Sequence, residues 1–337
     1  MQVQQNVSLK QYNTFGIDVA ASQFATFSDL EELKELADAS SASRQLILGG
    51  GSNMLFTGDF AGWVLKNEIR GVKVVDETEE FVYVQAGAGE NWHQLVQLCV
   101  NKGWAGLENL SLIPGNVGAS PMQNIGAYGV EVKDLIQEVQ AWHIGEQQLV
   151  SFTNEDCEFG YRESVFKRKH KNRFVILQVT YRLRKHPVFH TSYGAIQKEL
   201  ELMGVQELSI RAVAEAVIRI RSSKLPDPSK LGNAGSFFKN PSVTNEKMDQ
   251  VKVDFPTIPA YENADGSWKL AAGWLIEQCG WKGFRKGDAG CHAQQALVLV
   301  NYGGATGKEI YQLSEEILQS VVEKFGVLLE REVNIIT

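Results

Sequence analysis

Two strand-like segments of this chain each run directly into a glycine-rich turn, and few folds accommodate that pattern. Residues 46–48 precede Gly49-Gly50-Gly51-Ser52-Asn53, and residues 81–86 precede Gly87-Ala88-Gly89-Glu90-Asn91-Trp92. Glycines let the backbone turn sharply and bring bare N–H groups close to an anion, so the first turn suits a phosphate-bearing cofactor. The second turn lacks the third glycine of the dinucleotide fingerprint, because Trp92 stands there. The Rossmann fold therefore loses its main support, and we expect an ordinary strand–turn–helix at this turn.

A third glycine-rich stretch lies at residues 111–129. It contains four glycines and two prolines but almost no charge, whereas flexible linkers are polar. An apolar, glycine-dense loop commonly packs its backbone against a flat or phosphorylated ligand. A buried tight turn is the alternative interpretation of the same residues.

Periodicity and turn residues predict the remaining elements. A Ser28-x-x-Glu31 capping box predicts a helix over the following apolar positions, and residues 135–183 are rich in strand-like alternation. Helices are expected over 210–220, over 270–279, and after the Thr306-x-x-Glu309 capping box, with an extended segment at 327–336. Pro226 forbids continuation of the first of these helices, so we place a domain boundary there.

Composition narrows the class of protein. The 337 residues are 44% hydrophobic and 22% charged, which favours two soluble domains, and the net charge of −7 argues against nucleic acid as a partner. The chain shows neither a signal-peptide pattern nor a long apolar stretch, so we expect a cytoplasmic protein without membrane association. The four cysteines form no C-x-x-C pair, which predicts buried thiols and no metal site. The basic run at 167–173 is interpreted as a solvated turn, with phosphate docking as the alternative.

Ser236 lies between a small-residue turn and two phenylalanines, twelve residues after Lys224. No G-x-S-x-G elbow surrounds it and no histidine is near it in the sequence, so we interpret it as a proton donor rather than a nucleophile. Other polar residues in apolar surroundings join it as candidates: Tyr161, Arg162, Tyr193, Lys224, Asn240, Lys269, Gln295 and Glu332. Each has a structural alternative. Arg162 could form a surface ion pair, Lys224 could end a helix, Glu332 could be an exposed strand residue, and Ser236 could form a turn.

A series of motifs, taken in order, resembles one enzyme family. They are Asn13-Thr14-Phe15, Leu48-Gly49-Gly50-Gly51-Ser52-Asn53, Ile113-Pro114-Gly115-Asn116-Val117-Gly118, Gln123-Asn124-Ile125-Gly126-Ala127-Tyr128-Gly129, Tyr161-Arg162, Lys224-Leu225-Pro226-Asp227-Pro228, Gly235-Ser236-Phe237-Phe238-Lys239-Asn240-Pro241 and Glu332-Val333. Together they resemble the UDP-N-acetylenolpyruvoylglucosamine reductases, which make UDP-N-acetylmuramate for the bacterial cell wall. The resemblance runs from about residue 6 to residue 336. The glycine motifs are shared with other flavoproteins, whereas the Lys224 and Ser236 motifs are highly specific.

This resemblance implies an α+β fold with a vanillyl-alcohol-oxidase-type (PCMH-type) FAD-binding domain. That region would span residues 1–223 in two α+β lobes, about 1–70 and 71–223. A smaller α+β substrate-binding domain would follow at 224–326. The terminal segment 327–337 would carry Glu332 into the active site.

The resemblance also implies the chemistry. NADPH reduces bound FAD, and flavin N5 passes hydride to C3 of the enolpyruvyl group, leaving carbanion character at C2. Ser236 then protonates C2, because a carbanion beside a carboxylate is basic enough to accept a proton from a neutral hydroxyl. Arg162 and Glu332 would hold and polarise the carboxylate region. Glu332 would have to be protonated, or hydrogen-bonded to a cation, to help an anion.

The remaining roles follow position by position. Cofactor contacts would come from Gly49, Gly50, Gly51, Ser52, Asn53, Pro114, Gly115, Asn116, Gly118, Ala119, Ser120, Asn124 and Gly126. Substrate contacts would come from Tyr161, Tyr193, Arg221, Lys224, Asn240, Tyr261, Lys269, Lys282 and Gln295, with Tyr193 on a loop that marks one subgroup. Two positions depart from the family pattern, since Arg331 stands where proline is common and Asn334 where arginine is common.

Two other functions remain open. An FAD-dependent oxidase could use the same scaffold, although no His or Cys stands in the glycine loops for covalent flavin attachment. A non-catalytic UDP-sugar or flavin-binding module is the second alternative, but a binder has no need of a proton donor. We expect a monomer whose partners are the UDP-sugar substrate and NADPH.

Overall fold

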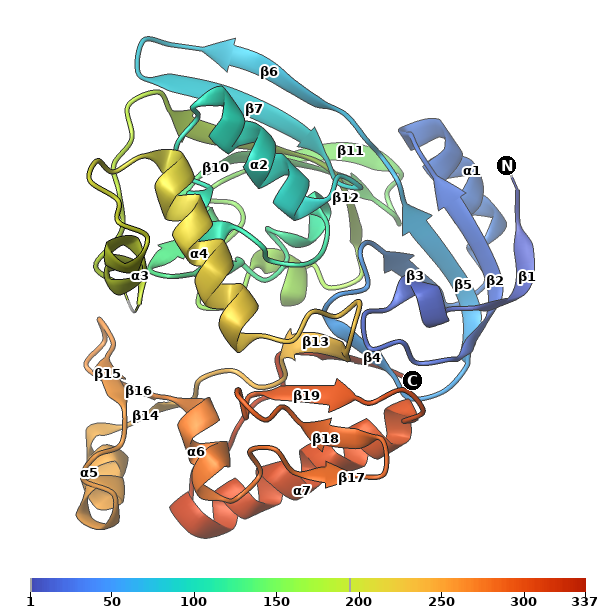
Figure 1. Ribbon diagram of the computed structural model, residues 1–337. Helices are drawn as coiled ribbons and strands as arrows, with labels where there is room; N and C mark the ends of the chain where they lie inside the picture. The colour runs from blue at the N-terminus through green and yellow to red at the C-terminus, as the bar shows by residue number, and fades with distance from the viewer. Residues whose placement is uncertain (1, 194) are drawn as a thin grey trace. The chain divides into compact units, whose positions relative to one another are not determined.

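The computed structural model describes residues 2–193 and 195–337, which divide into two compact units (Figure 1). The first unit comprises the residues up to Val7, Ala21–Gly50 and Ala61–Ser223. The second comprises Ser8–Ala20, Gly51–Phe60 and Lys224–Thr337, so it takes two short segments from the N-terminal part of the chain. The domain bounds expected from the resemblance describe what each part binds, and they stay a prediction.

The first unit begins with a four-stranded sheet in the order β1-β2-β5-β3. Its strands are β1 (Gln4–Ser8), β2 (Ala20–Phe27), β5 (Phe60–Asn67) and β3 (Gln45–Leu48), and β3 runs parallel to β5. Helix α1 (Leu30–Ala39) buries Leu33 and Leu36 in a core shared with strands of this sheet. The predicted capping box was one residue out of register. Asp29 is the N-cap and accepts from the amide of Glu32, because its side chain reaches the first free N–H groups of the helix.

The second sheet of this unit is antiparallel, in the order β11-β10-β12-β7-β6. Its strands are β11 (Gln148–Thr153), β10 (Ile136–His143), β12 (Phe174–Arg184), β7 (Phe81–Gly87) and β6 (Val72–Glu77). Helix α2 (Trp92–Lys102) lies over this sheet in Figure 1, and its apolar face joins the largest core cluster. The strand–turn–helix predicted around Trp92 is confirmed.

The rest of the first unit consists of helices, turns and one short two-stranded sheet. Helix α3 is Ile196–Leu202 and helix α4 is Ile210–Lys224, which ends before Pro226 as predicted. The glycine-rich residues 111–129 form no long element. They contain the 3₁₀ turn η3 (Val117–Ala119) and lead into the short strands β8 (Gly126–Ala127) and β9 (Val130–Glu131). Further 3₁₀ turns are η2 (Glu108–Leu110), η4 (Val132–Asp134) and η5 (Val165–Lys167).

The second unit contains a four-stranded sheet in the order β13-β19-β18-β17. The strands are β13 (Gly232–Ser236), β19 (Val298–Asn301), β18 (Ala289–Cys291) and β17 (Arg285–Lys286). Helix α7 (Gly307–Phe325) runs along this sheet in Figure 1 and opens with the predicted Thr306–Glu309 capping box. Helix α6 (Ala272–Gln278) is shorter than predicted, because Leu270 belongs to a strand.

Two smaller sheets complete this unit. One has the order β14-β16-β15 and consists of β14 (Ser242–Val243), β16 (Trp268–Leu270) and β15 (Ala260–Glu262), with helix α5 (Asn245–Asp254) beside it in the sequence. The other pairs β20 (Asn334–Ile336) in parallel with β4 (Met54–Phe56), which explains why residues 51–60 belong to the second unit. The turn η1 (Lys10–Tyr12) also lies here.

Two global expectations can be compared with the structure. Across the described residues, every helix is too short or too polar to cross a membrane. Cys99, Cys157 and Cys291 are buried, as predicted, whereas Cys279 is only half-buried. All four cysteines are free thiols.

Candidate active site

Within the first unit, the three glycine-rich turns lie against one another through residues 49–50, 88–89 and 114–120. A Cβ atom on Gly50 would lie 2.9 Å from Asn116 Oδ1 and 2.9 Å from Gly115 Cα, so the first turn contacts the loop at 114–120 through backbone. The Asn116 amide donates to the carbonyl of Gly89 in the second turn at 3.0 Å. Gly118 packs so closely on Ala88 that an added Cβ would lie 2.7 Å from that residue's Cβ. Glycine is required here because backbone segments meet directly.

This arrangement fits a phosphate-bearing group such as FAD. At Gly49 an added Cβ would meet only Asn116 Cβ, at 3.8 Å, so the turn keeps room beside it. Gly50, Pro114 and Ala119 are exposed, which makes the rim of the three turns accessible. Backbone amides of a glycine-rich turn are donors that a diphosphate takes. The first turn is the candidate, because the amides of residues 87–90 and 117–120 already donate to carbonyls within the chain. The residues present therefore suit the predicted cofactor.

Not every predicted cofactor residue has its side chain available. The Ser120 hydroxyl and the Tyr181 hydroxyl share a buried hydrogen bond of 2.7 Å, and burial raises the pKa of Tyr181. The Asn124 amide donates to Gly160 O and to Glu131, so it fixes the loop from within. Because the side chains of Ser120 and Asn124 are already bonded within the protein, these residues would contact a cofactor through their backbone atoms.

Three more predicted cofactor residues, Gly51, Ser52 and Asn53, belong to the second unit. Gly51 has φ 62° and packs against the carbonyl of Tyr12, where any side chain would overlap. Asn53 donates to the carbonyl of Glu332 at 3.3 Å and accepts from the amide of Asn334 at 3.1 Å. Asn53 therefore holds the C-terminal segment in place.

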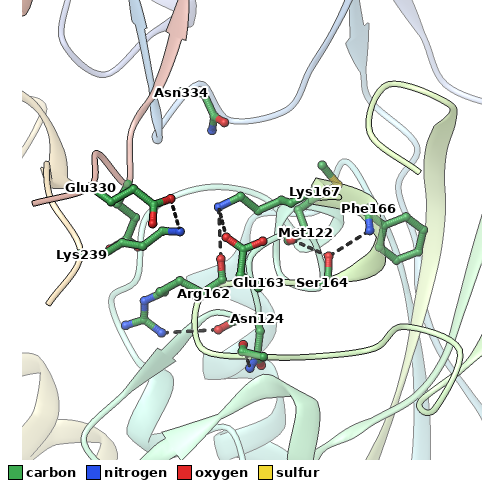
Figure 2. Close-up of polar contacts among 12 residues, drawn as sticks. Met122, Asn124, Arg162, Glu163, Ser164, Phe166, Lys167, Lys239, Glu330 and Asn334 are labelled. Atoms are coloured by element: carbon green, nitrogen blue, oxygen red, sulfur yellow. Dashed lines mark hydrogen bonds and ion pairs between the residues drawn. The ribbon is translucent and has the colours of Figure 1, made fainter. Parts of the chain in front are cut away.

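Two arginines of the first unit lie close together. Arg162 donates to the carbonyl of Gly126 at 2.7 Å and to that of Asn124 at 3.4 Å, as Figure 2 shows for the latter. Arg221 donates to the carbonyl of Leu112 at 3.3 Å and bonds the Tyr128 hydroxyl. Burial lowers the pKa of Arg221, Tyr128 opposes this, and the charge of Arg162 lowers it further. Two neighbouring guanidinium groups form a positively charged site, which suits an anion.

Backbone strain is concentrated in the same place. Eight non-glycine residues of the described chain have positive φ, and four of them contribute to this cluster or contact it: Leu112, Asn124, Tyr128 and Arg162. Such conformations cost roughly 1–3 kcal/mol each and accumulate at functional sites. The role of Arg162 itself stays a prediction. Tyr161 contributes its ring, 5.4 Å from the Arg162 guanidinium carbon.

Ser236 ends strand β13 at an irregularity in the second unit. The pairing of β13 with β19 shifts register between Asn233 and Ser236, and Gly235 has φ 72°. The buried Asn233 shapes this turn, because its amide donates to Pro226 O and Leu231 O and its Oδ1 accepts from the amide of Gly235. Asn233 thus links the proline turn at 226 to the strand that presents Ser236. Ser236 itself is half-buried.

Glu332 lies on the segment next to the one that carries Ser236. The amide of Glu332 donates to Phe237 O at 2.8 Å, and the amide of Lys239 donates to Glu330 O at 2.8 Å. Phe238 and Arg331 form the antiparallel bridge between these bonds. The structure therefore brings two of the three predicted catalytic residues onto adjacent, hydrogen-bonded segments, and Glu332 is half-buried rather than exposed.

Several predicted substrate residues of the second unit also lie near one another. Asn240 Oδ1 accepts from the amide of Ala272 at 3.0 Å and so caps helix α6. Gln295 lies against the same turn, since its Oε1 would be 3.0 Å from a Cβ on Gly273. Tyr261 and Lys269 are direct cross-strand partners in β15 and β16, which places them side by side.

Other predicted substrate residues occupy ordinary structural positions. Lys224 is exposed at the last position of α4, in agreement with its alternative as a helix C-terminal cation. Lys282 forms an ion pair with Glu277 at 2.9 Å. Tyr193 is 54% exposed and packs near Gly129, where an added Cβ would lie 3.2 Å from its Cβ. Their assignment to substrate rests on the resemblance.

The structure shows contributors that the sequence interpretation did not single out. Asn233, Tyr128, Lys239 and Glu330 are each bonded within the groups described above. Lys239 had a signal in the sequence, since a lysine directly after two buried phenylalanines must find a partner. Glu330 had none, because its pairing depends on tertiary structure.

A separate hollow of about 550 Å³ in the second unit is a weaker candidate site. It is lined by Lys10, Lys308 and the glycine-rich loop before α7. The amides of Gly303 and Ala305 already donate to Asn301, and that of Gly304 donates to Asp288. A loop whose amides are satisfied internally does not offer an anion cradle. Within residues 2–193 and 195–337, His, Cys, Asp and Glu side chains form no group of three or more that could hold a metal ion.

The fold and these groups define the class of protein: a two-unit α+β flavoprotein with an FAD-binding part followed by a separate C-terminal domain. A family model described as "FAD binding domain" matches residues 21–147, and one described as "UDP-N-acetylenolpyruvoylglucosamine reductase, C-terminal domain" matches residues 227–336. The chain belongs to the UDP-N-acetylenolpyruvoylglucosamine reductase family.

Full-length relatives support the assignment to this family. Proteins named UDP-N-acetylenolpyruvoylglucosamine reductase from Amoebophilus asiaticus and Flavobacterium johnsoniae are each 49% identical over 338 residues, with 100% of both chains covered. The relative of the same name from Pseudomonas putida is 48% identical, with 99% of both chains covered. The crystal structure of the reductase from Thermus caldophilus covers 100% of both chains at 25% identity, with a TM-score of 0.71. The predicted family, α+β fold and FAD-binding domain are confirmed.

Proposed function

We propose that this chain catalyses the NADPH-dependent reduction of UDP-N-acetylglucosamine enolpyruvate to UDP-N-acetylmuramate, a step in peptidoglycan synthesis. Identity of about one half over the full length of named relatives supports this activity. The observation that carries the residue assignment is the backbone bridge that sets the segments of Ser236 and Glu332 side by side. A cytoplasmic location and a monomeric state remain predictions.

FAD, which the glycine-rich turns would hold, would supply the hydride transfer from NADPH to the enolpyruvyl double bond. The chain's own residues then control charge and protons. Arg162 is proposed to pair with the substrate carboxylate, because guanidinium groups bind planar anions through two parallel hydrogen bonds. The bonds to the carbonyls of Asn124 and Gly126 fix the position of its guanidinium group.

Ser236 is proposed to protonate C2 after hydride reaches C3. The reacting carbon carries carbanion character beside a carboxylate, so a neutral hydroxyl is acidic enough and no neighbouring base is needed. Position is then decisive, and the Asn233 turn and the bridge to residues 330–332 supply it. Glu332 is proposed to act as a hydrogen-bond donor in its protonated form, or through a cation, to stabilise the transient anion.

The test is to separate the two half-reactions in Ser236→Ala. We expect NADPH to reduce the bound flavin at nearly the unmodified rate, while reoxidation by the enolpyruvyl substrate slows by at least about 100-fold. Ser242→Ala, a serine on strand β14 of the same unit, is the matched control and should leave both steps unchanged. An equal fall of both half-reactions in Ser236→Ala would show that Ser236 is not the proton donor.

A further inference from the structure

A lysine with an almost completely buried side chain links the Ser236 segment to the Glu332 segment. The Lys239 side chain is 9% exposed, and its Nζ lies 2.6 Å from Glu330 Oε1 (Figure 2). Lys239 is three residues after Ser236, and Glu330 is two residues before Glu332. The ion pair therefore joins the two segments within three residues along the chain of both proposed catalytic residues.

The ion pair coincides with the backbone bridge. The amide of Lys239 donates to Glu330 O, so the same two residues are joined through backbone and side chain. The neighbouring Arg331 ties the C-terminal segment to α7, since its Nε donates to Ser314 at 2.9 Å and it pairs with Glu315 at 2.7 Å. The segment that carries Glu332 is thus held on one side by α7 and on the other by Lys239.

The two partners differ in solvent exposure, so the loss of the ion pair would affect the Lys239 ammonium more than the Glu330 carboxylate. Glu330 is 71% exposed, so its carboxylate loses little hydration, whereas the Lys239 ammonium is buried and requires a counter-charge. A slip of one segment along the other would separate that ammonium from the Glu330 carboxylate. The pair therefore penalises changes of register between the two segments.

We propose that Lys239 and Glu330 are positioning residues that hold Ser236 and Glu332 in the register needed for proton delivery. This inference rests on the function proposed above for Ser236. It goes further by assigning the accuracy of proton delivery to an ion pair outside the reacting groups.

The test uses Glu330→Gln and Lys239→Met, with Lys239→Arg as the conservative rescue. Glu316→Gln is the matched control, because Glu316 pairs with Lys286 at 3.0 Å elsewhere in the same unit. The holoenzyme is assayed in single-turnover half-reactions in light and heavy water. Hydrogen exchange of the peptides covering 236–240 and 328–334 is measured separately and needs no turnover.

In Glu330→Gln and Lys239→Met we expect slower reoxidation by the enolpyruvyl substrate, by about 10- to 100-fold, with flavin reduction by NADPH little changed. The solvent isotope effect on reoxidation should rise, because misplacement makes proton transfer more rate-limiting, and exchange at 236–240 and 328–334 should accelerate. Lys239→Arg should restore most of the rate. A merely structural pair would lower the folded fraction without changing the isotope effect, and that result would overturn the proposal.

Two other outcomes distinguish a failure of the positioning role from a failure of the proposed function of Ser236. If Ser236→Ala blocks reoxidation but Glu330→Gln behaves like Glu316→Gln, the positioning role is wrong and the proton donor stands. If Ser236→Ala reoxidises normally, the proposed function of Ser236 fails, and the positioning role fails with it.

Discussion

Asn233→Ala should weaken both the stability of the second unit and the proposed chemistry, and the structure allows the size of the first effect to be worked out. Asn233 is 2% exposed and makes three hydrogen bonds, to Pro226 O at 3.2 Å, to Leu231 O at 2.8 Å and from the Gly235 amide at 2.9 Å. At about 1 kcal/mol for each bond, the loss is about 3 kcal/mol of unfolding free energy.

A matched control exists on the neighbouring strand. Asn301 is 4% exposed and also makes three hydrogen bonds, to Phe15 O at 2.9 Å and from the amides of Gly303 and Ala305 at 2.8 and 3.0 Å. Asn301→Ala should therefore cost a similar free energy, about 3 kcal/mol. Asn301 shapes the loop before α7, whereas Asn233 shapes the turn that presents Ser236.

The assay is urea unfolding of both variants, followed by single-turnover reoxidation of the reduced flavin by the enolpyruvyl substrate under conditions where both variants are folded. Asn233→Ala should slow reoxidation by about tenfold or more, since a small displacement of the donor is costly, and Asn301→Ala should not. Equal reoxidation rates in the two variants would refute the claim that Asn233 positions Ser236. A change of less than about 1 kcal/mol in Asn233→Ala would refute the hydrogen-bond argument.

Two further predictions concern stability alone. Gly307→Ala should cost at least about 3 kcal/mol in urea unfolding, because the new Cβ overlaps Phe56 O, whereas Gly58→Ala, with nothing within 4 Å, should stay within about 0.5 kcal/mol of the unmodified chain. Burial raises the pKa of the Cys99, Cys157 and Cys291 thiols from 9.0 to about 12. Above pH 9 these thiols ionise in the unfolded chain but stay neutral in the folded one. Their contribution to the free energy of unfolding is therefore complete below pH 9 and is lost as pH rises toward 12. Each should lower the unfolding free energy by about 1.4 kcal/mol per pH unit in that window, and Cys157→Ala should flatten the measured slope by that amount; an unchanged slope would contradict the assignment.

Local patterns in the sequence predicted the elements that depend on local interactions. Strand–turn–helix at Trp92, the end of α4 before Pro226 and the Thr306 capping box follow from nearest-neighbour chemistry, and all are confirmed. The Ser28 capping box was wrong by one residue because Ser28 and Asp29 both offer N-cap oxygens, and the choice between them depends on how α1 packs.

Tertiary pairing determines the candidate site, and the sequence carries little trace of it. The motifs named Ser236 and Glu332 separately, but only the bridge at Phe238 and Arg331 shows that their segments are neighbours. Asn240 was expected to contact substrate. In the structure its Oδ1 accepts a hydrogen bond from the amide of Ala272, at the beginning of α6. Whether Asn240 also meets substrate stays a prediction, because its amide nitrogen could still do so.

The departure at Arg331 has a structural explanation. Phe238 and Arg331 are a non-hydrogen-bonded pair of the antiparallel bridge. The two backbone bonds across the bridge are donated by the amides of Lys239 and Glu332, so the amide of Arg331 is not needed for either bond. A proline at 331 would therefore keep both bridge hydrogen bonds. Arginine keeps them too and adds contacts to Ser314, to Glu315 and to the Tyr311 ring, 4.6 Å away. Proline stiffens the segment that carries Glu332 through its own ring, whereas in this chain Arg331 fastens the same segment to α7. The two residues thus meet one requirement, a fixed path for the backbone at Glu332, by different physical means.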